Sequence, residues 1–435
     1  MSIDLHEKDS AQLETTGRFI VTYREGAKDQ ALAALERTAG VSQAKVLSSS
    51  DFGETGVDMA QLPADGGVVL ENLGIAVVTM DEGAAGAMAL ESGEDAAILA
   101  IEPEGYVYAL GEEKGLSLDY LKGFRDAAEA LHAAASQGGE DTQEVELAAL
   151  YNDTTALTWG LQATKASVSR FSGKGTTVAI LDTGLDLRHP DFAGRSIVSR
   201  SFVAGVSSAQ DGHGHGTHCT GTACGPLRPG TGRRYGIAYG AKIYIGKVLT
   251  DKGGGEDGWV LAGIEWAVAN RCNVISMSLG GLRPMTSAAY ENAGQRALNA
   301  GTLIVAAAGN NADRARGQYG FVNQPANGRA VMAVGAVDAN LRIANFSVRD
   351  TVRQSGTGVD IVGPGVDVYS ALPLPKLHGS MSGTSMATPH VAGIAALWAE
   401  KTGARGAALW QQLIVSARAL PIAVVDAGRG LVQAP

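Results

Sequence analysis

The sequence has few cysteines, no long apolar run and no long run of basic residues. Three cysteines in 435 residues, an odd and low number, argue against a disulfide framework. No apolar stretch reaches the roughly 18 residues of a membrane span, so no membrane partner is expected. The basic part of the chain holds no long run of lysine or arginine and no interleaving of basic with aromatic residues, which argues against a nucleic-acid partner. The acidic start lacks the apolar segment of a signal peptide, which predicts a cytoplasmic protein; leaderless export or a trimmed signal peptide is the alternative.

The composition is that of a globular protein with an uneven charge. Apolar residues make up 45% and charged residues 18% of the chain. Residues 1–150 hold 28 acidic and 9 basic side chains, a net charge of −19, and the remainder carries +9. Opposite charges steer and orient docking, so the two parts of the chain are expected either to attract each other or to be separately solvated.

The pattern of the N-terminal part predicts a small α+β unit. Strand-like alternation over 17–24, 74–80 and 106–110 and helical spacing over 28–39 suggest two strand–helix–strand repeats, the rhythm of a ferredoxin-like fold. We predict this unit over residues 1–112. A helix at about 117–136 and an acidic linker follow within 113–155.

From residue 156 to 435 the pattern changes to a second, larger domain. Near-continuous apolar runs alternate with helical segments, which predicts an α/β domain with a doubly wound parallel sheet. The predicted strands are 176–183, 242–249, 273–279, 302–309 and 330–337, and the helices 258–271, 287–300 and 385–400. Ligands of such sheets bind beyond the carboxyl ends of the strands.

Four polar residues at these positions supply the parts of one reaction. Asp182 and Asn310 each end a predicted strand, Ser385 begins a predicted helix, and His215 lies in "DGHGHGTHC". Taken singly, the Asp and Asn suit turns and the Ser suits a helix cap. Together they form a nucleophile, a base, a carboxylate that orients the base, and an oxyanion donor.

The motifs around these residues resemble the subtilisin-type serine proteases. They read "VAILDTGLDLRHPDF", "GHGTHCTGT", "SMSLGG", "VAAAGN" and "GTSMATPHVAG", in the Asp, His, Ser order of that family. Cys219 after His218 is similar to the proteinase K branch, where a free thiol packs beneath the catalytic histidine. The resemblance implies an endopeptidase acting on polypeptides as a monomer through an acyl-enzyme intermediate.

The resemblance also assigns roles residue by residue. Asp182 orients the base His215, Ser385 is the nucleophile, and Asn310 donates to the oxyanion with the Ser385 backbone. Six residues would form the two edges that sandwich an extended substrate: Ser278, Leu279, Gly280, Gly253, Gly254 and Gly255. Ala307, Ala308 and Gly309 would line a primary specificity pocket suited to a large apolar side chain. Glu256 and Asp257 would either favour a basic residue in an outer pocket or lie in a solvated loop.

No cofactor is expected. The family's tightest calcium site uses an aspartate that matches Asp191, but its second half here reads "CGPLRPGTGRRYG", a basic loop without the oxygen ligands that calcium needs. A structural calcium site there is therefore doubtful, and no metal ligand is assigned.

The N-terminal unit resembles the family's pro-domain, which templates folding and then inhibits with its C-terminal tail. The resemblance implies a zymogen that processes itself, and the linker places the cleavage near 147–157, with Leu150 and Tyr151 as candidates.

Two alternative hypotheses of function remain from the sequence. The histidines His213, His215 and His218 have the spacing of a metallo-β-lactamase-type zinc site, but Thr217 stands where that family has aspartate. His213 is otherwise a rim residue and His218 a packing residue. A catalytically dead scaffold on the same fold is the second alternative, although every triad position is filled.

Overall fold

The structure is a computed structural model and describes residues 15–93, 96–110, 149–349 and 356–435. The predicted helix at 117–136 lies outside the described residues, as does most of the linker that follows it. Among the described residues, no helix is both long and apolar enough to cross a membrane.

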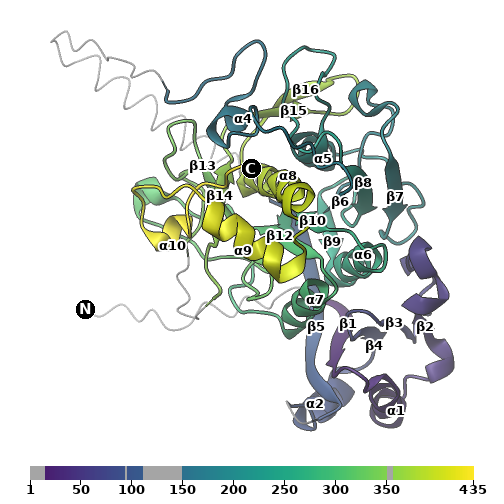
Figure 1. Cartoon of the computed structure of the whole chain (residues 1–435). Coiled ribbons are helices and arrows are strands. Elements are labelled where there is room, and N and C mark those ends of the chain that lie inside the picture. The colour runs from purple at the N-terminus through teal and green to yellow at the C-terminus, as the bar shows by residue number, and fades with distance from the viewer. Residues whose placement is uncertain (1–14, 94–95, 111–148, 350–355) are drawn as a thin grey trace, which may run out of the picture.

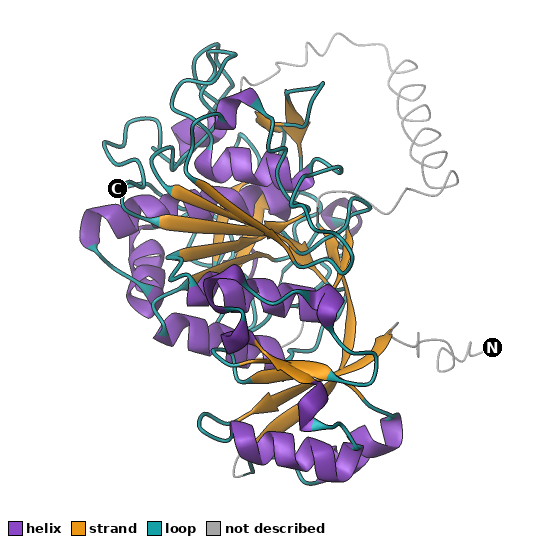
Figure 2. Ribbon diagram, turned by 90° about the vertical axis from the view of Figure 1, so that its right-hand side faces the viewer, coloured by secondary structure: helices purple, strands orange, loops and turns teal. Residues whose placement is uncertain are grey.

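The N-terminal unit is a β-sheet with two helices on one face (Figure 2). Its elements are β1 (Thr15–Tyr23), α1 (Lys28–Ala39), β2 (Val46–Ser48), β3 (Gly67–Leu70), β4 (Ile75–Thr79), α2 (Glu82–Leu90) and β5 (Ile98–Ala109). The order β5-β1-β4-β3 is antiparallel, and β2 adds in parallel to β3. The predicted strand–helix–strand repeats are present. The strand expected at 106–110 is the end of a longer strand, β5, which begins at Ile98.

Alternation along the strands makes both faces of this sheet apolar. Val21 packs with Leu35 of α1 and Met88 of α2. The adjacent Ile20 points the other way and joins the core of the larger domain. Successive side chains of a strand point to opposite faces, so each strand contributes to two cores. The N-terminal unit therefore packs against the rest of the chain through a whole sheet face.

The larger domain is built on a seven-stranded parallel sheet, as predicted. Its order is β14-β13-β12-β10-β6-β8-β7. The bounds are β6 (Thr177–Asp182), β7 (Ile197–Ser201), β8 (Lys242–Lys247), β10 (Val274–Met277), β12 (Leu303–Ala307), β13 (Met332–Val337) and β14 (Ile361–Pro364). Two strands at the sheet edges were not predicted from the sequence: β7, whose residues are partly polar and exposed, and the short β14.

Helices cover both faces of this sheet (Figure 1). They are α4 (Trp159–Ala163), α5 (His215–Cys224), α6 (Asp257–Ala269), α7 (Ala288–Asn299), α8 (Thr384–Thr402), α9 (Gly406–Ser416) and α10 (Val424–Ala427). Shorter strands complete the domain: β9 (Gly254–Glu256), β11 (Leu279–Gly280), β15 (Val368–Ala371) and β16 (His378–Met381). Within β10, Val274 packs on the side of α5 and α8, and Ile275 on the side of α6.

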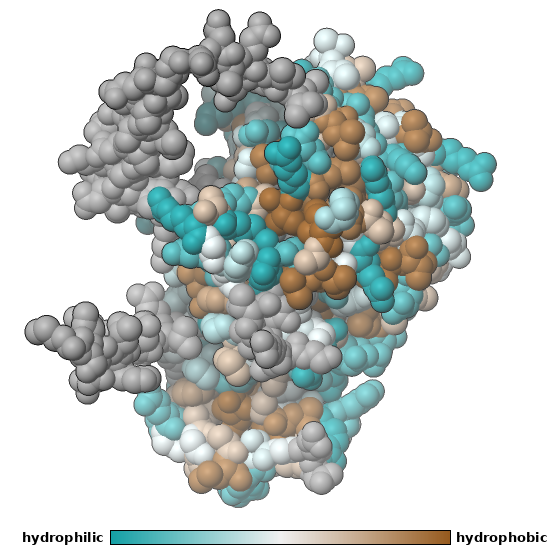
Figure 3. Space-filling view, turned by 90° about the vertical axis from the view of Figure 1, so that its left-hand side faces the viewer, coloured by the Kyte–Doolittle hydropathy of each residue, from teal (hydrophilic) through white to brown (hydrophobic). Residues whose placement is uncertain are grey.

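The side of the molecule that carries α9 and α10 shows apolar side chains on the surface of the larger domain (Figure 3). Val415, Val424 and Val425 are among its exposed residues.

Candidate active site

The polar residues predicted at strand ends meet at one edge of the parallel sheet. Asp182 is the last residue of β6, and Asn310 follows β12 closely. His215 is the first residue of α5, and Ser385 is the second residue of α8. Because parallel strands end at the same edge of a sheet, residues up to 203 positions apart in the chain converge there.

Asp182 and His215 form a buried pair. His215 Nδ1 lies 2.8 Å from Asp182 Oδ1 and 3.0 Å from Oδ2. Burial lowers the pKa of His215, but the adjacent Asp182 carboxylate outweighs it and holds this pKa well above its ordinary value. The other ring nitrogen, Nε2, is buried and has no hydrogen-bond partner among the described residues. The imidazole is thus oriented by the carboxylate with Nε2 left for a proton.

Ser385 lies where α8 begins, close to this pair. Its Oγ donates to the carbonyl oxygen of Ser278 at 3.1 Å and also contacts the carbonyl oxygen of Leu110. Cys219 connects the two halves of the site, because its Sγ lies 3.5 Å from the Ser385 carbonyl oxygen and 3.9 Å from His215 Nδ1. Burial raises the pKa of the Cys219 thiol, which therefore stays protonated.

Asn310 is held so that its amide points at Leu110. Asn310 Oδ1 accepts from the backbone N–H and the hydroxyl of Thr384, both at 2.9 Å. Its Nδ2 is then free to donate, and it donates to the Leu110 carbonyl oxygen at 2.6 Å. One carbonyl oxygen thus meets both the candidate oxyanion donor and the candidate nucleophile.

The six residues predicted to flank a substrate strand flank the end of β5. Ala109 pairs with Leu279 and Tyr108 with Gly280 on one side. On the other, Tyr108 pairs with Gly254 and Val107 with Gly255. Two further backbone bonds, Ala109 N to Gly253 O at 2.9 Å and Leu110 N to Ser278 O at 3.1 Å, complete the three-stranded arrangement.

The predicted specificity pocket lies beside Leu110 and also contains Asn323, which was not predicted from the sequence. A methyl group built on Gly280 would lie 3.1 Å from Leu110 Cδ1 and 3.3 Å from Asn323 Cβ. Ala308 is fully buried next to Gly309, and its carbonyl oxygen accepts from Asn323 N at 2.8 Å. Asn323 stands in a segment without apolar periodicity, so the sequence carried no signal for it.

The three histidines of the opening motif do not converge on one point. His218 Nε2 contacts the Val368 carbonyl oxygen at 2.9 Å, and burial lowers the pKa of His218 to about 3. The rings of His213 and His215 meet edge-on, with centroids 6.3 Å apart. His213 also lies near Gly253, at the rim of the substrate strand.

Two groups among the described residues bring possible metal ligands close together. One is Asp182, His215 and Cys219, which is the buried pair with its neighbouring thiol. The other is His189, Asp191 and His378. In the second group His189 Nδ1 accepts from Asp191 N and its Nε2 contacts the Leu377 carbonyl oxygen at 2.7 Å, so both ring nitrogens are engaged.

The Asp191 carboxylate, the candidate calcium ligand, is surrounded by hydrogen-bond donors. It accepts from Tyr235 Oη at 2.6 Å, His378 Nε2 at 2.8 Å and Gly230 N at 3.0 Å. Despite burial, these donors lower the pKa of Asp191. A calcium ion requires a shell of oxygen ligands. The residues around Asp191 therefore do not fit this ion.

Glu256 and Asp257 do not lie in a solvated loop. Glu256 forms an ion pair with Arg18 of the N-terminal unit. Asp257 is buried at the start of α6, where it binds Arg283 at 2.7 Å and accepts from Gly105 N at 2.9 Å. Both carboxylates are therefore already engaged, by the N-terminal unit and by Arg283.

The predicted processing residues are not the ones presented to Ser385. Leu150 N donates to Asn340 Oδ1 at 3.0 Å, and Tyr151 N donates to the Ala339 carbonyl oxygen at 3.1 Å. The site is occupied by the end of β5, whose Leu110 contacts Asn310 and Ser385. Cleavage near 147–157 stays a prediction, which assumed that the helix and linker extend the tail.

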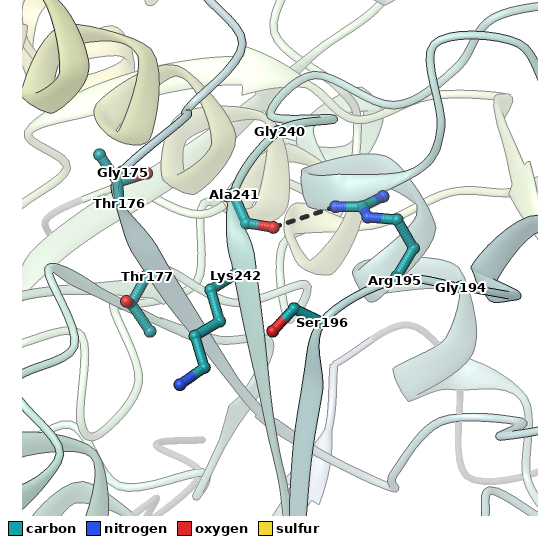
Figure 4. A pocket seen from close by; sticks show the side chains of 9 residues that line it. All are labelled: Gly175, Thr176, Thr177, Gly194, Arg195, Ser196, Gly240, Ala241 and Lys242. Atoms are coloured by element: carbon teal, nitrogen blue, oxygen red, sulfur yellow. Dashed lines mark hydrogen bonds between the residues drawn. The ribbon is translucent and has the colours of Figure 1, made fainter.

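A separate polar hollow lies at the opposite ends of the strands (Figure 4). Thr177 begins β6 and Lys242 begins β8, and Arg195 beside them donates to the Ala241 carbonyl oxygen at 3.1 Å. It is therefore not part of the arrangement around Ser385.

A doubly wound α/β domain with a buried Asp–His pair, a serine at a helix start and a side-chain oxyanion donor defines a serine hydrolase. Comparison with known proteins narrows this class. The sequence model of the Subtilase family matches residues 173–430. The M-protease of Shouchella clausii is 39% identical over 318 residues, which are 72% of this chain and 77% of that protein. Subtilisin Savinase of Lederbergia lenta is 42% identical over 249 residues, 57% of this chain and 85% of that protein. The chain belongs to the subtilase family, and it is a serine endopeptidase of the subtilisin type.

Proposed function

We propose that this endopeptidase is made in an inhibited form, with residues 15–110 bound to the catalytic domain as a folded inhibitor and Leu110 in the position of the residue before the cleaved bond. The proposal rests on the contacts of the Leu110 carbonyl oxygen, which accepts a hydrogen bond from Asn310 Nδ2 at 2.6 Å and contacts Ser385 Oγ. A polypeptide substrate would lie in the same way between β9 and β11, held by main-chain hydrogen bonds.

The arrangement of Ser385, His215, Asp182 and Asn310 supports the following reaction, in which Ser385 Oγ turns from the Ser278 carbonyl oxygen to His215 Nε2. Ser385 Oγ attacks the carbonyl carbon while His215 Nε2 takes the hydroxyl proton, and Asp182 stabilises the imidazolium that forms. Asn310 Nδ2 donates to the oxygen as it becomes negative. His215 then gives its proton to the leaving amide nitrogen, the C–N bond breaks, and an acyl ester remains on Ser385. A water molecule, deprotonated by His215, hydrolyses this ester and restores the hydroxyl.

Carboxylates of the N-terminal unit bind the starts of two catalytic-domain helices, which supports its role as an inhibitor. Glu102 accepts from Ala288 N at 3.1 Å, Ala289 N at 2.8 Å and Ser287 Oγ at 3.0 Å at the start of α7. Glu104 accepts from Gly258 N of α6 at 2.8 Å. A carboxylate at a helix N-terminus satisfies free backbone N–H groups and the helix dipole.

A carboxylate of the catalytic domain makes the reciprocal contact. Glu265 of α6 is buried and accepts from Ser49 Oγ at 2.6 Å, from Asn72 N and Nδ2 at 3.1 and 2.7 Å, and from Leu73 N at 3.1 Å. Burial raises the pKa of Glu265, although these donors oppose the shift. Glu102 and Glu265 thus accept hydrogen bonds from the opposite unit, and Glu104 accepts from Gly258 N in addition to Arg18 of its own unit, which favours one docked arrangement.

Self-processing after Leu110 is tested by mass spectrometry of the purified full-length chain. The wild-type protein is expected to yield a new N-terminus at Gly111, and Ser385→Ala is expected to stay at 44.7 kDa. Asn299→Ala, at the exposed end of α7, is the control and is expected to process normally. A first cleavage at Leu150–Tyr151, or cleavage of Ser385→Ala at the same rate, would contradict the proposal.

A further inference from the structure

Asn323 has a polar side chain in the specificity pocket that nothing in the described structure satisfies. It is fully buried, and neither Oδ1 nor Nδ2 has a hydrogen-bond partner among the described residues. A buried carboxamide without partners is unfavourable. Because both atoms are unpaired, exchanging the nitrogen and the oxygen of the amide would still leave the side chain without a hydrogen bond.

The backbone fixes this side chain against the pocket walls. Asn323 N donates to the Ala308 carbonyl oxygen at 2.8 Å, and Gly281 N donates to the Gln324 carbonyl oxygen at 3.0 Å. The segment is thereby joined both to the end of β12 and to the strand edge that pairs with β5. A Cβ atom on Gly309, whose φ is +131°, would lie only 2.5 Å from Asn323 Nδ2. The carboxamide therefore lies directly on a glycine of the pocket.

The side chain of Leu110 occupies the same pocket and offers Asn323 no hydrogen bond. A methyl group on Gly280 would be 3.1 Å from Leu110 Cδ1 and 3.3 Å from Asn323 Cβ, so the side chains of Leu110 and Asn323 both lie against Gly280. Asn311 Oδ1, which also has no hydrogen-bond partner in the described part of the chain, lies 3.1 Å from the Cβ position of Gly309. An apolar side chain in this pocket thus leaves donors and acceptors buried and unpaired.

We propose that Asn323 makes this endopeptidase prefer a neutral amide side chain, that of glutamine, immediately before the cleaved bond. The inference rests on the proposed placement of Leu110 in the active site. A glutamine carboxamide both donates and accepts, and so can satisfy both atoms of Asn323. The pocket walls given by Ala308, Gly280 and Gly309 carry no charge, so glutamate or lysine would bury an unpaired charge there.

The preference also gives Leu110 a function in the inhibited state. Leucine fits between the small walls, but it leaves Asn323 unsatisfied, so the chain's own tail is a poorer occupant than a substrate with glutamine. Sites built to hydrogen-bond a substrate group discriminate against analogues that lack it, because their own polar groups are then left unpaired. The tail is thereby held tightly by its main chain and weakly by its last side chain.

The test uses the processed enzyme and peptides that copy the tail, Val-Tyr-Ala-X followed by a chromogenic leaving group, with X as Gln, Met, Leu or Glu. Met matches Gln in length without its hydrogen bonds. The wild-type enzyme is expected to cleave the Gln peptide with a kcat/KM about tenfold above that of the Met peptide, the effect of one to two neutral hydrogen bonds. Asn323→Ala is expected to lose this ratio, whereas the control Asn299→Ala retains it.

A second variant keeps the test decisive if Asn323→Ala does not fold. Asn323→Asp preserves the shape and adds a negative charge, and it is expected to raise cleavage of an X = Lys peptide above that of the wild-type enzyme. Equal cleavage of the Gln and Met peptides by the wild-type enzyme, or an unchanged ratio in Asn323→Ala, would overturn the inference. Failure of the wild-type enzyme to cleave any of these peptides would instead count against the proposed function.

Discussion

The amide of Asn310 donates to the carbonyl oxygen of Leu110 over 2.6 Å, although 200 residues separate the two in the chain. The same oxygen contacts Ser385 Oγ, and the residues before it pair on both sides with β9 and β11. A carbonyl held in this way is the starting point of the acylation step. This contact therefore joins the end of the N-terminal unit to the candidate catalytic residues, within the cleft between β9 and β11.

Removing the Asn310 donor is expected to slow the reaction much more than it weakens substrate binding. Asn310→Ala should lower kcat roughly 10²–10³-fold with little change in KM, the effect typical of subtilisin-type enzymes that lose this oxyanion donor. Steady-state kinetics on a peptide substrate measures it. The control is Asn299→Ala. A loss confined to KM would show that Asn310 only positions the substrate.

The carboxylate of Asp182 is expected to set the acid limit of activity. His215 must be neutral to accept a proton, and Asp182 holds the pKa of His215 well above its ordinary 6.5. Activity should therefore fall as the pH drops through that raised pKa. Asp182→Asn should lower kcat by about 10⁴-fold and move the acid limb of the residual activity to lower pH. A pH profile of kcat checks both; an unmoved limb would assign the titration to another group.

Loss of Glu265 is expected to loosen the proposed inhibitory complex. Glu265→Ala leaves the donors of Ser49, Asn72 and Leu73 without their buried acceptor, a destabilisation of about 1.5–3 kcal/mol, or roughly 10–100-fold in affinity. Freshly processed Glu265→Ala should show activity earlier than the wild-type enzyme in a progress curve. Glu82→Ala, exposed on α2, serves as the control. The same lag in all three proteins would place the binding energy elsewhere.

Asp191 is expected not to be a calcium ligand. Its oxygens already accept from Tyr235, His378 and Gly230, so Asp191→Asn should not alter the response of the protein to calcium. In the Ser385→Ala background, which prevents self-digestion, thermal unfolding with calcium and with a chelator measures this response. A calcium-dependent rise in Tm that disappears in Asp191→Asn would show that the ion replaces these donors.

Asp360 is expected to destabilise the fold above neutral pH. Burial raises its pKa to about 7 from an ordinary value of 3.8, although the Ala333 N–H at 2.8 Å opposes the shift. A raised folded-state pKa gives stability that is fully present below pH 3.8 and is lost as the pH rises towards 7. In the Ser385→Ala background, Asp360→Asn should be more stable than its parent at pH 8 and similar at pH 4 by urea unfolding. Equal stability at both pH values would contradict this.

The larger domain was predictable because its signals are local. Continuous apolar runs gave the positions of β6, β8, β10, β12 and β13, and polar residues at their ends indicated Asp182 and Asn310. The order of β7 and β14 at the sheet edges was not predictable, because edge strands are short or partly polar. The proteinase K-like role of Cys219 stays a prediction, although its thiol lies between His215 and Ser385 as that resemblance implies.

The sequence by itself determined the class of fold, the identity of the reacting side chains and the acidic character of the N-terminal unit, because each depends on periodicity, residue type or composition. Only the tertiary structure decided which segment enters the cleft. Leu110 rather than Leu150 meets Ser385, because β5 continues without a break from the N-terminal sheet into the space between β9 and β11. The tertiary structure also placed Asn323 in the specificity pocket, since its position depends on backbone contacts with Ala308 and with the substrate strand edge, which no local pattern encodes.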